Sequence, residues 1–190
     1  MQPQWLGYLN VDDVDASVAK IIAAGGAVRM PAMDVPGIGR FATVTDPQGA
    51  AFYVMAPIGE GPSRAFEPGT LGHGGWHELH TTDWEAALRF YGEHFGWART
   101  DAMDMGQMGK YLLFNAGAAP IGGMFNHPAS PHPAWLFYFI VDDIDAAKSR
   151  VETSGGSIVV GPTEVPGGDW IVQGRDPQGA MFALVGPHKG

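Results

Sequence analysis

The chain has 190 residues, 45% of them hydrophobic, and a formal net charge of −9 from 20 acidic and 11 basic side chains. Because the charge is negative and no basic run occurs, we expect neither nucleic acid nor a membrane surface as a partner. The lack of cysteine excludes disulfides, thiol nucleophiles and thiolate metal sites. No apolar run approaches the roughly 20 residues that cross a bilayer, and the first residues do not resemble a signal peptide, so we expect a cytoplasmic protein.

Residues 1–57 predict a strand, a helix and three further strands. Asp12 and Asp13 stand where they can cap the helix, and Gly25-Gly26 stands where it would end. A turn is expected at residues 46–49, Asp-Pro-Gln-Gly. The strands are expected at residues 5–11, 27–30, 40–45 and 51–55.

Two further modules follow a linker at residues 58–70. The middle module, residues 71–128, opens with an alternating strand at residues 76–81, and Asp83 begins a helix whose apolar face includes Leu88 and Tyr91. The last module, residues 132–190, repeats the first at a constant offset of 130 residues. Trp5-Leu6, Val11-Asp12-Asp13, Gly25-Gly26 and Asp46-Pro47-Gln48-Gly49-Ala50 recur as Trp135-Leu136, Val141-Asp142-Asp143, Gly155-Gly156 and Asp176-Pro177-Gln178-Gly179-Ala180.

The middle and last modules resemble those of the vicinal oxygen chelate superfamily, which includes glyoxalases, bleomycin resistance proteins and extradiol dioxygenases. The resemblance rests on the order of several strings, which are Trp76-His77-Glu78-Leu79-His80-Thr81-Thr82-Asp83, Phe95-Gly96-Trp97, the Val-Asp-Asp-x-Asp-Ala helix start and the Asp-Pro-x-Gly turn. It implies an α+β fold of three βαβββ modules. Residues 71–190 would form one complete domain, an eight-stranded cup-shaped sheet around a small-molecule cavity.

Residues 1–57 would then form a half domain, with an open sheet edge and an uncovered apolar face. Both features favour pairing with another chain. We therefore predict a homodimer in which a second copy completes the half domain; alternatively, the sequence is part of a longer two-domain protein.

The metal-ligand positions of the family carry no metal ligands here. The resemblance places them at Trp76 and Leu136 on the opening strands, and at Ala183 and Tyr53 on the closing strands. We predict no metal and no other cofactor. A divalent metal held by Glu78 and His80, joined by His73 or His77, is the alternative.

Strand alternation selects the residues that line the predicted cavity. On the opening strand of the middle module these are Trp76, Glu78 and His80. In the last module they include Leu136, Tyr138 and Met181. Trp170 either covers the entrance of the cavity or is only part of a turn. This lining is mostly apolar and aromatic, as in many small-molecule pockets.

Glu78 and His80 are the candidate catalytic residues, because a carboxylate and an imidazole on one strand face can act together as general acid and base. In the alternative interpretation, Glu78 accepts hydrogen bonds and only fixes the cup.

Three functions remain open. The first is a metal-independent protein of the glyoxalase and bleomycin-resistance type that binds a small apolar or aromatic molecule by stacking. The second is a glyoxalase- or dioxygenase-like lyase, isomerase or oxidoreductase that uses Glu78 and His80. The third is a structural or interaction role. Fold alone does not choose among them.

Overall fold

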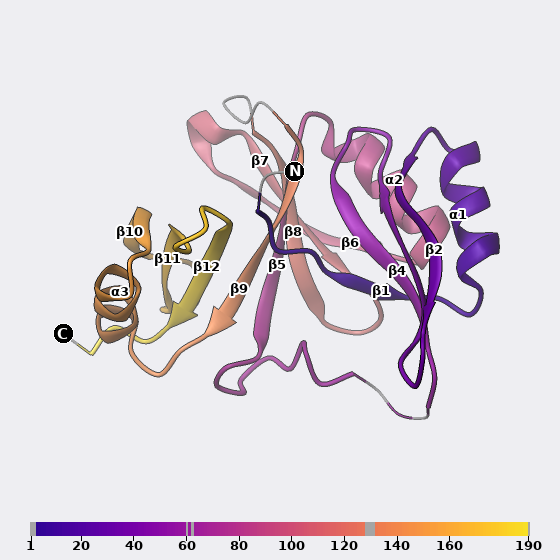
Figure 1. Cartoon of the computed structure of the whole chain (residues 1–190). Coiled ribbons are helices and arrows are strands. Elements are labelled where there is room, and N and C mark those ends of the chain that lie inside the picture. Colours follow the sequence, from indigo (N-terminus) through magenta and orange to yellow (C-terminus); the bar gives the residue numbers. More distant parts are fainter. Residues whose placement is uncertain (1–2, 60, 62, 128–131, 190) are drawn as a thin grey trace. The chain divides into compact units, whose positions relative to one another are not determined.

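The computed structural model describes residues 3–59, 61, 63–127 and 132–189 (Figure 1). It contains three helices, one short 3-10 helix and twelve strands in these residues. The first module comprises β1 (Tyr8–Asn10), α1 (Val14–Ala23), β2 (Ala27–Val35), β3 (Gly39–Thr45) and β4 (Ala51–Pro57). The middle module comprises β5 (Gly74–Thr81), α2 (Trp84–Phe95), β6 (Ala98–Asp104), the 3-10 helix η1 (Gly106–Met108), β7 (Lys110–Asn115) and β8 (Pro120–Asn126). The last comprises β9 (Ala134–Ile140), α3 (Ile144–Thr153), β10 (Ser157–Glu164), β11 (Trp170–Arg175) and β12 (Met181–Gly186).

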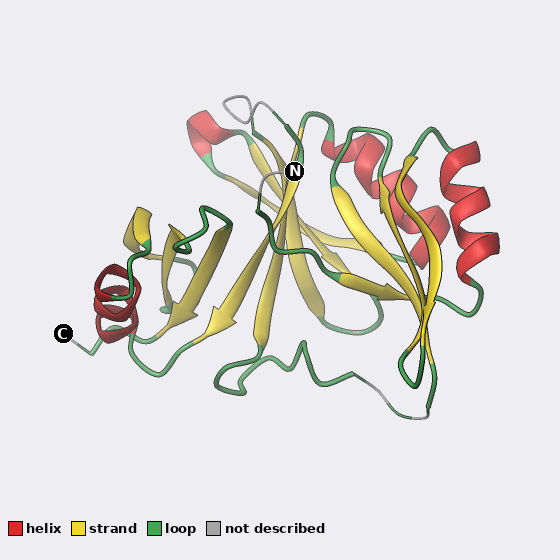
Figure 2. Ribbon diagram, in the orientation of Figure 1, coloured by secondary structure: helices red, strands yellow, loops and turns green. Residues whose placement is uncertain are grey.

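The strands form two sheets, so the predicted α+β class is confirmed. The first sheet has four strands in the order β1-β4-β3-β2, and the second has eight in the order β10-β11-β12-β9-β5-β8-β7-β6. Figure 2 shows the strands and the few helices of each module. The strand count of the larger sheet agrees with the prediction, whereas its cup shape stays a prediction.

Each helix begins at a capping aspartate, as the sequence predicts. The side chains of Asp13, Asp83 and Asp143 each accept a hydrogen bond from the backbone N–H three residues further on. This bond satisfies one of the N–H groups that the first helical turn leaves without a partner. Helix α2 ends at Gly96, whose φ of 71° lies in the left-handed region that glycine adopts readily.

The described residues cluster into two compact units. The first unit consists of the described residues within Met1–Trp5, Ser63–His77 and Leu136–Gly190. The second consists of those within Leu6–Pro62 and Glu78–Trp135. The first module therefore shares a unit with most of the middle module. This division differs from the predicted boundaries at residues 57 and 71, which follow the repeat and stay a prediction.

The core of the second unit joins α2 to the first sheet. The Phe52 ring of β4 contacts the rings of Phe90, Tyr91 and Phe95 on α2, at centroid distances between 5.7 and 6.5 Å. Phe52 and Tyr91 are almost fully buried. Helix α1 lies against α2 and the first sheet, so the two helices share one buried layer.

The core of the first unit lies on both sides of the last module's strands. Buried residues Ile144, Ala147, Val172 and Leu184 pack on the α3 side. Leu136, Tyr138 and Ala183 form a separate buried cluster. The strand alternation of β9, β11 and β12 separates these two sets, because successive side chains point to opposite faces.

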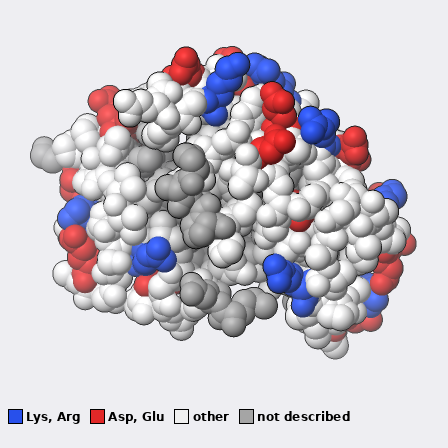
Figure 3. All heavy atoms as spheres, turned by 90° about the horizontal axis from the view of Figure 1, so that it is seen from above, with Lys and Arg blue, Asp and Glu red and all other residues white. Residues whose placement is uncertain are grey.

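Figure 3 shows acidic and basic side chains interspersed on the face that it draws. No helix among the described residues is long and apolar enough to cross a membrane.

Candidate functional site

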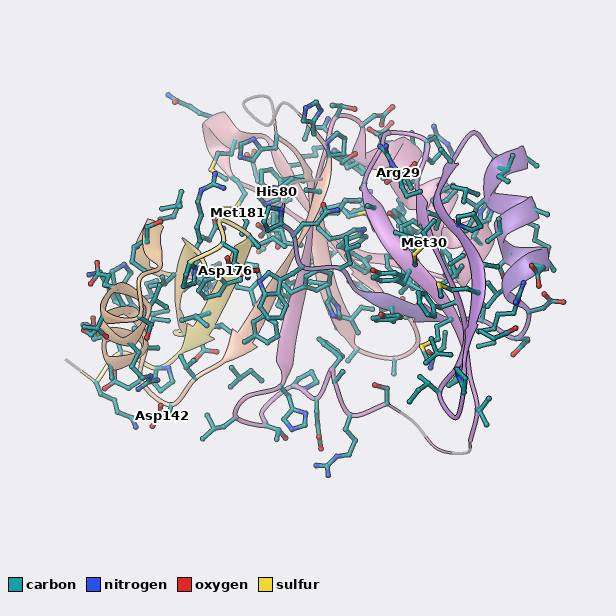
Figure 4. All side chains as sticks on the ribbon, in the orientation of Figure 1. Arg29, Met30, His80, Asp142, Asp176 and Met181 are labelled. Atoms are coloured by element: carbon teal, nitrogen blue, oxygen red, sulfur yellow. The ribbon has the colours of Figure 1, made fainter. Side chains whose placement is uncertain are left out.

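Strand β5 positions the two predicted catalytic residues on one face. Glu78 is buried and His80 is partly buried, while the alternate residues Leu79 and Thr81 are almost fully buried on the opposite face. Figure 4 labels His80 on this strand. The carboxylate and the imidazole are therefore neighbours by strand period alone.

Glu78 is held by two side chains. Its Oε1 lies 2.7 Å from Nε2 of His80, and its Oε2 accepts a hydrogen bond of 2.9 Å from the hydroxyl of Tyr111. Tyr111 comes from β7, two strands away in the sheet. Both carboxylate oxygens thus have partners, which offsets much of the desolvation cost of a carboxylate that is only 7% exposed.

A glycine makes room for the Tyr111 ring. Gly123 pairs with Leu113 on β7, and a Cβ atom added to Gly123 would lie 2.1 Å from the Tyr111 ring. No real side chain tolerates such a contact, so only glycine lets the tyrosine ring pass over β8 and reach Glu78.

His80 is enclosed by aromatic rings of β8 and the residue that follows it. The Phe125 ring lies edge-on at a centroid distance of 4.9 Å, and the His127 ring stacks at 4.9 Å. The Nδ1 atom of His127 is buried and has no hydrogen-bond partner within the part of the chain that the structure describes. The imidazole of His80 is therefore held in one orientation by Glu78 and by its ring neighbours.

Four of the predicted ligand-binding residues lie together in the first unit. Leu136 and Tyr138 of β9 are buried with Ala183, and Trp76 and Met181 pack against them. The Tyr138 hydroxyl accepts a hydrogen bond of 2.9 Å from the side chain of Gln173. Trp76 is only partly buried, so part of its indole is accessible.

Trp170 lies on the other face of its strand. It packs against the cluster on the α3 side, and its ring stacks on His188 at a centroid distance of 4.5 Å. Its neighbour Ile171 packs instead against the cluster of Leu136 and Tyr138. Strand parity thus separates Trp170 from the other four residues, and it does not enter the proposed site.

Comparison with known proteins decides the family. Residues 72–184 match the model of the Glyoxalase/Bleomycin resistance protein/Dioxygenase superfamily. The chain belongs to this superfamily. The predicted resemblance is thereby confirmed.

Relatives of the superfamily match almost the whole chain. CFP32 of Mycobacterium tuberculosis, a proposed glyoxylase by its name, is 37% identical over 189 residues, which are 98% of this chain and 71% of the relative. The anthracycline biosynthesis protein DnrV of Streptomyces peucetius is 35% identical over 187 residues, 95% of this chain and 65% of the relative. The chain is thus shorter than both of these proteins.

Two solved structures share the fold. The Mn(II)-bound glyoxalase from Novosphingobium aromaticivorans superposes with a TM-score of 0.65 at 20% identity, over 94% of this chain and 61% of that one. The 2,3-dioxygenase LapB from Pseudomonas sp. KL28 gives 0.61 at 15% identity, over 95% and 70%.

A metal ion does not fit the residues at the positions that the resemblance assigns to metal ligands. Trp76, Leu136 and Ala183 lie in or against one cluster, but an indole and two aliphatic side chains offer no ligand atom. Glu78 and His80 bind each other directly. No group of three or more His, Asp or Glu side chains in the described ranges is arranged to hold a metal ion.

Tyr111 and His127 are the site residues that sequence reasoning missed. The alternation of side chains along β7 and β8 does indicate that Tyr111 lies on the face of the candidate site, because Tyr111 pairs with Phe125 and lies on the same face of the sheet. The contact with Glu78 also depends on the missing side chain of Gly123, which only the sheet register reveals.

Proposed function

We propose that this superfamily member binds a planar, largely apolar small molecule on the face formed by Trp76, Leu136, Tyr138 and Met181, without a metal. The single observation that carries the proposal is the partly accessible Trp76 ring, packed against a buried apolar cluster. An accessible indole that packs on buried apolar side chains can stack on a planar ligand and bury part of the ligand's apolar surface. That the eight-stranded sheet is cup-shaped is part of this proposal.

The relatives suggest the class of ligand. Proteins 34% and 35% identical to this chain are named for anthracycline biosynthesis, and anthracyclines contain fused planar rings. We therefore propose a hydroxylated polycyclic aromatic compound. Its rings would stack on Trp76, and the Tyr138–Gln173 pair supplies a polar group at the edge of the apolar face.

The test is a titration with alizarin, a hydroxyanthraquinone, followed by tryptophan fluorescence and by calorimetry. Trp76→Phe is the test variant and Trp170→Phe the matched control, since Trp170 lies on the α3 side of its strand. We expect the wild type and the control to bind alike, and Trp76→Phe to bind roughly tenfold more weakly, a loss of about 1.4 kcal/mol. Equal affinity of the two variants, or no heat of binding in the wild type, would overturn the proposal.

A second candidate function is supported by the 2.7 Å contact between Glu78 and His80. A carboxylate that holds an imidazole fixes its orientation and stabilises its protonated form. The pair would then move a proton to or from a carbon beside a carbonyl group of a bound molecule.

This second function has its own test. Proton exchange at the carbon beside the carbonyl of hydroxyacetone is followed by NMR in heavy water. We expect the wild type to accelerate exchange and Glu78→Gln to abolish the acceleration, while Glu93→Gln, a change on the surface of α2, leaves it intact. An equal rate in wild type and Glu78→Gln would remove the pair from catalysis.

A further inference from the structure

The turn between β3 and β4 has a near-identical counterpart between β11 and β12. In both copies the aspartate Oδ1 accepts hydrogen bonds of 2.9 Å from the backbone N–H groups two and four residues later. The local fold of residues 46–50 and 176–180 is therefore the same.

The glutamine side chains of the two turns differ in what they contact. Gln48 Oε1 accepts hydrogen bonds from the hydroxyls of Thr81 and Thr82, at 2.8 and 2.6 Å. It also accepts from the backbone N–H groups of Thr82 and Asp83, at 3.2 and 2.8 Å. Its Nε2 donates to the carbonyl of Asp83 at 2.8 Å. The exposed side chain of Gln178 makes no such bond to any residue that the structure describes.

Gln48 thus holds the junction between β5 and α2. Thr81 is the last residue of β5, and Asp83 caps α2. His80 immediately precedes this junction, and Glu78 lies two residues before His80 on the same strand. A shift of the junction would move the strand that fixes the distance between the carboxylate and the imidazole.

The aspartate of the same turn supplies a second anchor. Asp46 Oδ2 accepts a hydrogen bond of 3.1 Å from Tyr91 on α2, and Tyr91 accepts one of 3.1 Å from Trp135 at the start of β9. Two anchors on one short turn restrict both its position and its rotation. The first module is therefore bound to the strand that carries the candidate catalytic pair.

We propose that Gln48 is a positioning residue for Glu78 and His80. The proposal rests on the second candidate function, to which it adds a residue from a different module. Gln48 touches no reacting group; it acts through the end of β5.

The first readout is the chemical shift of the His80 imidazole, followed by NMR. Gln48→Ala is compared with Gln178→Ala, which changes the same residue of the repeated turn. Four of the five hydrogen bonds that Gln48→Ala removes lie at exposed positions and the fifth, from the Thr81 hydroxyl, is part-buried, so the variant is expected to fold. We expect its His80 resonances to move, and those of Gln178→Ala to match the wild type. Gln48→Glu keeps an acceptor at Oε1 and should restore most of the wild-type signal.

The second readout is the hydroxyacetone exchange rate, which we expect to fall roughly tenfold in Gln48→Ala and not in Gln178→Ala. Wild-type His80 resonances in Gln48→Ala, or the same shifts in both variants, would overturn the positioning role. If the wild type shows no exchange activity, the catalytic proposal fails, whereas the His80 resonances still report whether Gln48 positions the pair.

Discussion

The hydroxyl of Tyr91 donates a hydrogen bond of 3.1 Å to Oδ2 of Asp46, and both residues are almost completely buried. Burial raises the pKa of Asp46, although hydrogen bonds from Ala50, Tyr91 and Gln48 oppose the shift. Burial also raises the pKa of Tyr91, and the negative charge of Asp46 adds to this effect. The raised pKa of Tyr91 keeps its phenol protonated at neutral pH, so the hydroxyl is the donor of this bond.

We expect the stability of the fold to depend on pH through Asp46. Its pKa in the folded state lies above the ordinary value of 3.8, so the protonated side chain favours the folded state. Its contribution is fully present below pH 3.8 and is lost as the pH rises through the raised pKa. Urea unfolding across this window should show the wild type losing stability relative to Asp46→Asn. A constant difference between the two proteins would contradict the assignment.

Removal of the Tyr91 hydroxyl should destabilise the second unit. In Tyr91→Phe the buried Nε1 of Trp135 and the Oδ2 of Asp46 both lose their partner. An unsatisfied buried polar group costs about 1–3 kcal/mol. Denaturant unfolding should show a loss in this range, while Tyr8→Phe, at a side chain that is 52% exposed, should change stability by less than about 0.5 kcal/mol. Similar losses in both variants would count against the buried network.

Gly123→Ala should displace Tyr111 from Glu78. The new methyl group would overlap the tyrosine ring, and overpacking of this kind typically costs about 1–3 kcal/mol. The double variant Tyr111→Leu/Gly123→Ala should cost less than the sum of its single changes, because the smaller side chain removes the clash. Strict additivity in a double-mutant cycle would show that the two residues do not meet.

The predicted homodimer has a specific geometric basis in the first sheet. β9, the counterpart of β1 in the repeat, has β12 on one side and β5 on the other, whereas β1 has only β4 beside it among the strands of the described residues. We expect light scattering and native mass spectrometry to give a dimer. Asn10→Pro should shift it toward monomer, because the N–H of Asn10 points away from β4 in a parallel pair whose bonds include Val11 to Met55. A wild-type monomer at all concentrations would refute this assembly.

The sequence predicts those structural elements whose formation depends on residues nearby in the chain. The aspartate caps, the glycine at the end of α2 and the alternation of β5 all depend on neighbours in the chain, and the structure contains each of them. The residues of β6, Ala98–Asp104, give no strand signal of their own, because they are mostly exposed and have no apolar alternation; only pairing with β7 makes them a strand. A strand without a buried face leaves no periodic signal.

The site was predicted less completely, because contacts across modules have no local signature. Tyr111 reaches Glu78 over a glycine on the next strand, and Gln48 reaches the end of β5 from a different module. The exact repeat was even misleading here, since it suggests that Gln48 and Gln178 have the same surroundings. The face of the sheet on which Trp170 lies can be assigned only from the register of β11, which pairs Trp170 with Gly186.

The two Asp-Pro-Gln-Gly-Ala segments thus have the same sequence but are under different structural constraints. At residues 176–180 the string only has to turn the chain, and many substitutions that keep the aspartate should be tolerated. At residues 46–50 it also has to fit a buried tyrosine and the start of a helix. A saturation library of both strings, sorted for folded protein, should therefore recover a wide set of residues at position 178 and a narrow one at position 48.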